Sequence, residues 1–86
     1  MGNEIHLKVV TPIKLVVDEQ VDEVIAPGEA GEFGVLPGHE PFVATLQNGV
    51  LKYRKDGVER ELTLEGGLAD VREDNVSILA DSVVQD

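Results

Sequence analysis

Cysteine is absent from this 86-residue chain, and aromatic residues are scarce: there are two phenylalanines, one tyrosine and no tryptophan. Without cysteine the chain has no disulfide and no thiolate metal site, which suits a reducing compartment. No apolar run approaches the roughly 18 residues of a membrane-spanning helix. With so few aromatic platforms and no serine in a nucleophile motif, the sequence does not favour a sugar-binding module or a small β-sandwich hydrolase.

Positive charge is also in short supply, since 7 Lys and Arg stand against 17 Asp and Glu, a formal net charge of −10. Nucleic-acid binding needs a basic surface that releases counterions, so we expect no nucleic-acid partner. The densest basic cluster consists of Lys52, Arg54 and Lys55, and the acids Glu59 and Glu61 follow it closely in the sequence. We expect this cluster to form a solvated face that pairs with its own acids.

Motifs for phosphate, metal or catalysis are missing as well. Gly28, Gly31 and Gly34 lack the spacing of a phosphate loop and lack a following Lys-Ser or Lys-Thr pair, so we interpret them as turn residues. His39-Glu40 begins like a zinc-protease helix, but Pro41 interrupts any helix there. We therefore expect no metal, no cofactor and no catalytic group.

Turn residues, by contrast, are frequent, and glycine and proline punctuate the chain every eight to twelve residues. That spacing is typical of many short strands in a sandwich or barrel. Ile5, Leu7 and Val9 alternate with polar residues, as in a half-buried strand. Further strands are expected over 13–17, 21–26, 42–47 and 50–54, giving eight to ten in all. The chain is long enough for one small domain.

Two hairpins can be predicted in register. Asp56-Gly57 suits a two-residue type I′ turn, which sets Arg54 opposite Glu59, Lys52 opposite Glu61, Tyr53 opposite Arg60 and Leu51 opposite Leu62. Glu73-Asp74 is expected to join 68–72 to 75–80, with Val71 opposite Val76 and Ala69 opposite Ile78. The apolar spacing after Val76 fits a helix as well as a strand, so the tail is ambiguous, and a strand that gives way to the start of a helix near Ala80 would satisfy both patterns.

One long stretch carries a family resemblance. Residues 28–53, "GEAGEFGVLPGHEPFVATLQNGVLKY", resemble the ε subunit of F-type ATP synthases, whose hallmark is a G-E-x-G-x-L/Y-P-G-H-x-P run before a short strand. The resemblance extends to "IHLKVVTP" near the start, "VDEVIAPG" at 21–28 and "GGLADVREDNVSILAD" at 66–81. It covers nearly the whole chain.

The resemblance implies an all-β, ten-stranded sandwich of two antiparallel sheets, with residues 1–86 as the N-terminal domain and without the family's C-terminal helical hairpin. That hairpin restrains ATP hydrolysis in the family, so we expect no such inhibition from this chain. The implied function is a non-catalytic rotor subunit that docks on the γ subunit and the membrane c ring and couples proton-driven rotation to ATP synthesis. The implied location is the cytoplasmic face of the bacterial inner membrane, peripheral and held through the complex.

Carried over residue by residue, the family's ring-facing contacts fall on Glu32, Pro37, Gly38, His39 and Glu40. Acidic side chains suit a ring whose loops are basic in the family, because complementary charge steers association. Glu40 departs from the family, which usually has a small residue there. The alternative for the same segment is that Pro37 and Gly38 only shape a turn and His39 caps it. The exposed apolar surface of such a docking domain also allows self-association when it is alone.

A second functional class stays open. Lipoyl and biotinyl carrier domains are also small, acidic and all-β, and carry a modified lysine at a hairpin tip, where this chain has Lys55. The neighbours of Lys55 do not match the M-K-M or D-K-A patterns of those domains. An added group on Lys55 in the intact mass would favour the carrier.

Overall fold

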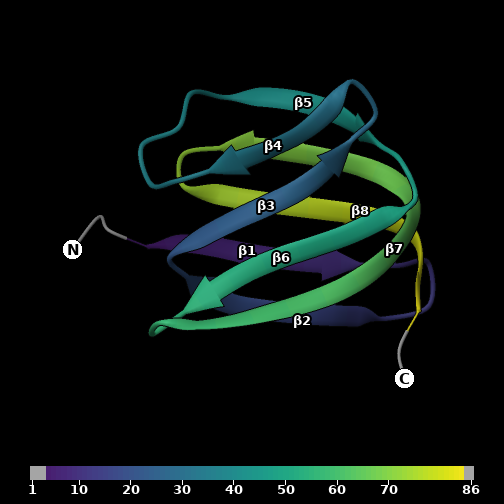
Figure 1. Cartoon of the computed structure of the whole chain (residues 1–86), viewed down its shortest axis with the longest axis horizontal. Coiled ribbons are helices and arrows are strands. Elements are labelled where there is room, and N and C mark those ends of the chain that lie inside the picture. The colour runs from purple at the N-terminus through teal and green to yellow at the C-terminus, as the bar shows by residue number, and fades with distance from the viewer. Residues whose placement is uncertain (1–3, 85–86) are drawn as a thin grey trace.

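The computed structural model describes residues 4–84, which form eight strands in two facing layers (Figure 1). The strands are β1 (Ile5–Val10), β2 (Leu15–Val21), β3 (Glu23–Gly28), β4 (Gly31–Val35), β5 (Phe42–Leu46), β6 (Gly49–Lys55), β7 (Val58–Arg72) and β8 (Asn75–Val84). No helix occurs within the described residues, and none could therefore span a membrane there. The predicted all-β sandwich is confirmed.

One layer is formed by β4, β3, β6 and the first half of β7, and the other by β5, the second half of β7, β8, β1 and β2. The strand order is β2-β1-β8-β7-β5-β3-β4, with β6 between β3 and β7. All ladders are antiparallel except β1 with β8, which is parallel. The expectation of purely antiparallel sheets is therefore wrong at that one pair.

The two long strands explain why eight strands are found where ten were expected. β7 pairs with β6 through its first half and with β5 through its second half, so one strand serves both layers. The bend falls at Gly66 and Gly67, which have φ of 73° and 138°. A Cβ on Gly67 would lie 2.4 Å from the carbonyl oxygen of Leu79, so only glycine fits there. β7 and β8 each remain one continuous strand through this region. Each therefore counts once, which gives eight strands and not ten.

Apolar residues of both layers fill the space between them. Ile5, Leu7 and Val9 are fully buried, which confirms the alternation expected of β1. The described residues contain no buried polar or charged residue. The buried apolar set is Ile5, Leu7, Val9, Val17, Val21, Val24, Ala26, Val35, Leu46, Leu51, Tyr53, Leu64, Ala69, Val71, Val76, Ile78 and Ala80. Phe33 and Phe42 are only partly buried and pack at the margin of this core.

Both predicted hairpin registers are confirmed. The β6–β7 ladder pairs Arg54 with Glu59 and Leu51 with Leu62, and the β7–β8 ladder pairs Val71 with Val76. The two turns take positive φ at their central residues: Asp56 and Gly57 at 52° and 80°, and Glu73 and Asp74 at 49° and 61°. Positive φ at both positions is the signature of a type I′ turn, whose twist matches that of the strands.

Two local predictions are wrong. The residues after Ala80 continue β8 to Val84 instead of starting a helix, because they pair with Thr63, Leu64 and Glu65 of β7. Gly31 and Gly34, which the sequence suggested as turn residues, lie instead on the strand β4, where Gly34 is opposite Ile25. Pairing with β3 thus overrides the glycine signal. The strand expected at 13–17 begins at Leu15.

Candidate partner-binding edge

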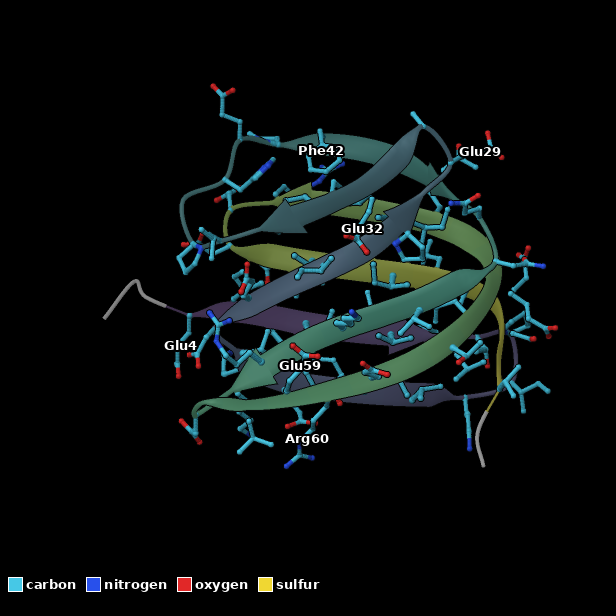
Figure 2. The ribbon with its side chains drawn as sticks, in the orientation of Figure 1. Glu4, Glu29, Glu32, Phe42, Glu59 and Arg60 are labelled. Atoms are coloured by element: carbon cyan, nitrogen blue, oxygen red, sulfur yellow. The ribbon has the colours of Figure 1, made fainter. Side chains whose placement is uncertain are left out.

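Glu32 lies on β4, which pairs with β3 alone and is therefore an edge strand. Its Cα lies opposite Pro27, and its side chain is exposed (Figure 2). The hairpin that carries it is compact because Gly28 is buried under the ring of Phe33. A Cβ on Gly28 would lie 2.5 Å from the carbonyl oxygen of Gly31 and 2.9 Å from Cδ2 of Phe33. Gly28 thus lets the Phe33 ring lie against the backbone.

Pro37 and Gly38 form the centre of a turn between β4 and β5. The amide of His39 donates to the carbonyl oxygen of Leu36 at 3.2 Å, and Gly38 has a φ of 86°. Proline followed by a residue with positive φ is the pattern of a type II turn. Pro37 and Gly38 therefore shape a turn, and His39 closes it through its backbone amide.

The turn is held in place by a residue far away in the sequence. The amide of Gly38 donates to Oδ1 of Asp74 at 2.6 Å. Asp74 lies in the β7–β8 turn, and its own carbonyl oxygen accepts the amide of His6 at 2.9 Å. One residue thus connects the β4–β5 turn to both β8 and β1.

Three rings in a row connect this turn to the strand that carries Glu32. The ring centroids of His39 and Phe42 are 5.0 Å apart with a 44° tilt, and those of Phe42 and Phe33 are 5.0 Å apart at 76°. The second pair has the edge-to-face arrangement that aromatic rings favour. Nδ1 of His39 also lies 2.7 Å from the carbonyl oxygen of Glu40. The imidazole is therefore fixed from two sides.

A groove lies beside these rings, between the β3–β4 hairpin and β5. It is lined by Gly28, Glu29, Ala30, Gly31, Glu32, Phe33, Phe42, Val43, Ala44 and Thr45 and encloses about 460 Å³. Figure 2 shows Glu29 and Glu32 on the hairpin and Phe42 on β5. Within the described residues neither carboxylate has a hydrogen-bond or ion-pair partner. The groove therefore has an apolar floor and an acidic rim.

The structure brings the predicted site residues to one side of the sandwich but not to one point. Glu32 lies five residues before Pro37, which is at most about 16 Å along the chain at 3.3 Å per residue. Glu40 is exposed at the end of the turn. Sequence reasoning missed Phe33, Phe42 and Asp74, which fix the geometry. The two phenylalanines are the only ones in the chain and flank the turn, so the sequence carried a signal for them. It carried no signal for Asp74, which is far from the turn in the sequence.

Two members of the basic cluster form ion pairs within the chain, but with acids on other strands and not with the predicted Glu59 and Glu61. Nη1 of Arg54 lies 2.6 Å from Oε1 of Glu23, and Nζ of Lys55 lies 3.0 Å from Oε1 of Glu19. Arg54 thus pairs in space with Glu23 on β3, although its ladder partner is Glu59. These cations are not available to the unpaired carboxylates of the groove.

Two further ion pairs lie on the outer face of the β1, β2 and β7 layer. His6 Nε2 contacts Asp18, and this hydrogen bond holds the pKa of the Asp18 carboxyl below its ordinary value. Arg72 donates to both carboxylate oxygens of Asp70, which raises the pKa of its guanidinium. Residues 4–84 contain no cluster of three or more His, Cys, Asp or Glu that could hold a metal ion.

Comparison with known proteins gives a consistent result. The sequence model of the family described as "ATP synthase, Delta/Epsilon chain, beta-sandwich domain" matches residues 4–86. The chain is 46% identical over 82 residues to an ATP synthase epsilon chain of Citrifermentans bemidjiense, and 49% identical over 82 residues to one of Nitratidesulfovibrio vulgaris. Each alignment covers 95% of this chain, but only 59% and 61% of the respective relatives.

Solved structures show the same fold. A chain in the mitochondrial ATP synthase of Euglena gracilis, in an assembly that includes the c-ring, superposes with a TM-score of 0.90 at 28% identity. That alignment covers 95% of this chain and 53% of the other. A chain in the central stalk and c-ring of the Tetrahymena thermophila mitochondrial enzyme superposes with a TM-score of 0.81 at 16% identity, covering 94% and 66%, which establishes likeness of fold alone.

Proposed function

Since the chain belongs to the family of the ATP synthase delta/epsilon-chain β-sandwich domain, we propose that it serves in the central-stalk rotor of an F-type ATP synthase as a non-catalytic subunit. The observation that carries the proposal is the family match over residues 4–86, together with 46–49% identity to epsilon chains. Because the chain spans about three fifths of those relatives, the role of the whole protein is inferred.

The proposed partners are the γ subunit and the membrane c ring, and the proposed work is to couple proton-driven rotation of the ring to γ and so to ATP synthesis. Such work needs a rigid body with at least one docking surface and no reactive group. The described residues fit: a core without buried polar residues and one edge with unpaired carboxylates. Location at the cytoplasmic face of the bacterial inner membrane, held there through the complex, follows from the same proposal.

Glu32, Pro37, Gly38, His39 and Glu40 are the proposed contact residues. Pro37 and Gly38 hold the turn in one conformation, which reduces the entropy lost when a partner orders it. Glu32 and Glu40 supply negative charge on either side of that turn. The ring row from His39 to Phe33 keeps these two parts of the edge in fixed relation.

Co-purification with γ and the c ring tests the proposal. We expect the unaltered chain to be retained by both partners, and the pair of changes Glu32→Lys and His39→Ala to reduce retention on the c ring at least tenfold. The control is Glu4→Lys, an equal charge reversal on an exposed residue outside the proposed contacts (Figure 2). Failure of the unaltered chain to bind either partner contradicts the rotor role, and equal retention of all variants contradicts the contact residues.

Inhibition of ATP hydrolysis, which the family resemblance assigns to a helical hairpin, is proposed to lie outside residues 1–86. We also propose that these residues fold as one domain. A hydrolysis assay with added chain checks the first point: the rate is expected to stay unchanged, and a dose-dependent fall contradicts it.

The carrier alternative rests on Lys55, and the structure offers it little support. Nζ of Lys55 is paired with Glu19 of β2 and does not project from the hairpin tip. A carrier lysine must swing freely between active sites. An intact mass that includes a lipoyl or biotinyl group would revive the alternative.

The isolated chain has a surface for self-association on the outer face of the layer that contains β1, β2 and β8. Leu15, Leu68 and Leu79 are 52%, 37% and 49% exposed there. Cross-strand pairing places Leu68 opposite Leu79, Leu79 beside Val10 and Val10 opposite Leu15, so the three leucines form one apolar row. Concentration-dependent sedimentation that is reduced by Leu79→Ser is the expected result.

A further inference from the structure

We propose that the β1–β2 hairpin can be exchanged between two copies of this chain, with Asp22 as the hinge, and that the contacts of Asp22 hold the hairpin on its own chain. The partner is a second copy, which supplies β1 and β2 to the sandwich of the first. The inference goes beyond the proposed function, because it depends on the topology of the chain and not on γ or the c ring. It also differs from association through the exposed leucine row, in which each sandwich keeps its own strands.

One ladder joins the β1–β2 hairpin to the rest of the sheet. β2 is the last strand of its layer and pairs with β1 alone, so the ladder of β1 with β8 is the only one that connects the hairpin to the other described strands. That ladder is parallel, and parallel pairing is slightly less stable per residue than antiparallel pairing. The hairpin is therefore a terminal unit that can leave with its own internal ladder intact.

The rest of the sandwich needs a hairpin in this place. The hairpin supplies five buried apolar residues of the core, namely Ile5, Leu7, Val9, Val17 and Val21. Burial of such side chains is the dominant favourable term in folding, so a sandwich that has released its own hairpin gains by taking up that of a second copy. The exchanged dimer restores the same contacts between chains, which makes exchange a low-cost route to a dimer.

The connection that has to open is a single residue. β2 ends at Val21 and β3 begins at Glu23, so Asp22 alone joins a strand of one layer to a strand of the other. Two hydrogen bonds hold this corner: the amide of Asp22 donates to the carbonyl oxygen of Arg54 at 2.7 Å, and its Oδ2 accepts the amide of Asp56 at 3.1 Å. If Asp22 becomes extended, β2 and β3 form one continuous strand that carries the hairpin away from its own sandwich. Short connections are those that favour exchange.

Charge at the hinge opposes the exchange at low salt. Residues 18–23 read DEQVDE, with four acids and no base. A two-fold dimer brings the two extended hinges side by side, and like charges that face each other on neighbouring strands are destabilising. Because salt screens such exposed charges, we expect the dimer fraction to rise with salt concentration.

Refolding of the whole chain from denaturant at roughly millimolar and at roughly micromolar concentration tests the inference. We expect a dimer at the high concentration that persists on dilution, because separation requires the hairpin to be released again. Asp22→Val removes the acceptor of the Asp56 amide and favours an extended backbone. It is expected to raise the dimer fraction about tenfold, the factor that corresponds to one lost charge-assisted hydrogen bond. Asp22→Asn is the matched control, since it removes the same charge but keeps an acceptor oxygen, and it is expected to stay close to the unaltered chain.

Introduced cysteine pairs identify which chain supplies the hairpin, because the sequence has no cysteine of its own. Lys8→Cys with Ser77→Cys changes two Cα partners of the β1–β8 ladder. Oxidation after folding links them within one chain in the monomer and between two chains in the exchanged dimer, which a denaturing, non-reducing gel distinguishes. Asp70→Cys with Ser77→Cys, partners in the β7–β8 ladder, is the control and gives links within one chain in both cases.

Two results would overturn the inference. One is a dimer in which the Lys8→Cys and Ser77→Cys pair is linked only within chains, because that dimer forms through a surface. The other is a monomer at both concentrations and at high salt. If Asp22→Val does not fold, the unaltered chain at high salt decides the question by the same links. Neither measurement involves γ or the c ring, so its outcome and that of the rotor proposal are separate.

Discussion

Along the edge where β2 meets the β6–β7 hairpin, charged side chains join the two layers. Along the edge between β4 and β5, backbone hydrogen bonds such as the one from the amide of Glu29 to the carbonyl oxygen of Thr45, at 2.8 Å, join them instead. At the first, closed edge, Lys55 pairs with Glu19, Asp22 accepts the amide of Asp56, and the amide of Asp22 donates to the carbonyl oxygen of Arg54. At the second, open edge, the carboxylates of Glu29 and Glu32 have no partner within the described residues.

The difference separates two uses of charge in one small acidic domain. At the closed edge, opposite charges meet across the gap and exclude other strands, one of the ways in which proteins protect sheet edges. At the open edge, unpaired carboxylates lie beside aromatic side chains. These carboxylates remain able to attract a positively charged group of another molecule.

The largest effect is expected at Gly28, on which the open edge depends. In Gly28→Ala the new methyl group would meet the Gly31 carbonyl at 2.5 Å, so the hairpin must shift. We expect a loss of about 1–3 kcal/mol in the free energy of unfolding, as for an overpacked core. Gly34→Ala is the control, since its Cβ would have its nearest neighbour at 3.9 Å. Chemical denaturation compares the two, and equal losses would show that the packing at Gly28 is unimportant.

Asp74 comes next, because it holds the turn of the open edge from a distance. Asp74→Ala removes the acceptor of the Gly38 amide. For a charge-assisted bond at an exposed turn we expect about 1 kcal/mol, which corresponds to roughly fivefold faster local opening. Hydrogen exchange at Gly38 measures it, and Asp74→Asn, which keeps an acceptor oxygen, should restore most of the protection. Unchanged exchange in the alanine variant argues against this connection.

A smaller effect is expected from the ion pair of the closed edge. Lys55→Met should lower the free energy of unfolding by about 0.5–1 kcal/mol, since the pair is only part-buried. A double-mutant cycle with Glu19→Gln isolates the pairwise energy. Glu32→Gln on the open edge is the comparison and should leave stability unchanged, because no partner is lost. If Glu32→Gln lowers the free energy of unfolding more than Lys55→Met does, the proposed difference between the two edges is contradicted.

The smallest effect concerns the pair that joins β1 to β2 beside the closed edge. The hydrogen bond from His6 lowers the pKa of Asp18 below its ordinary value of 3.8. A carboxyl whose pKa is lower in the folded state than in the unfolded state stabilises the fold at pH values above its unfolded-state pKa. That stabilisation is lost as the pH falls through the folded-state pKa. His6→Gln should raise the pKa of Asp18 and reduce the resistance to acid unfolding. Titration of the Asp18 carboxyl carbon checks the direction, and an unaltered pKa in the variant rules out the pairing.

The parts of the fold that the sequence predicted are those set by local rules. The two hairpin registers, the type I′ turn at Asp56 and Gly57, and the alternation in β1 depend on neighbouring residues, and they follow from side-chain period and backbone sterics. β4 was missed because its glycines read as turns, and only pairing with β3 makes a strand of them. The tail after Ala80 was missed for a similar reason, since its apolar spacing fits a helix until β7 offers a partner.

The site was predictable only where the chain is continuous. The turn at Pro37 and Gly38 follows from its dipeptide, and the charge of Glu32 is plain in the sequence. The groove needs Phe33 and Phe42 to meet across the gap between two strands, and the turn needs Asp74 from another hairpin. Such contacts depend on tertiary packing, which no local pattern specifies.

The most direct test of the central claim is backbone hydrogen exchange of this chain in complex with γ and the c ring, compared with the chain alone. If the open edge is the docking surface, protection should rise over β4, the turn at 36–41 and β5, and should stay unchanged over β2 and the β6–β7 turn. Protection confined to β2 and the β6–β7 turn, with none over β4 and β5, would contradict the account.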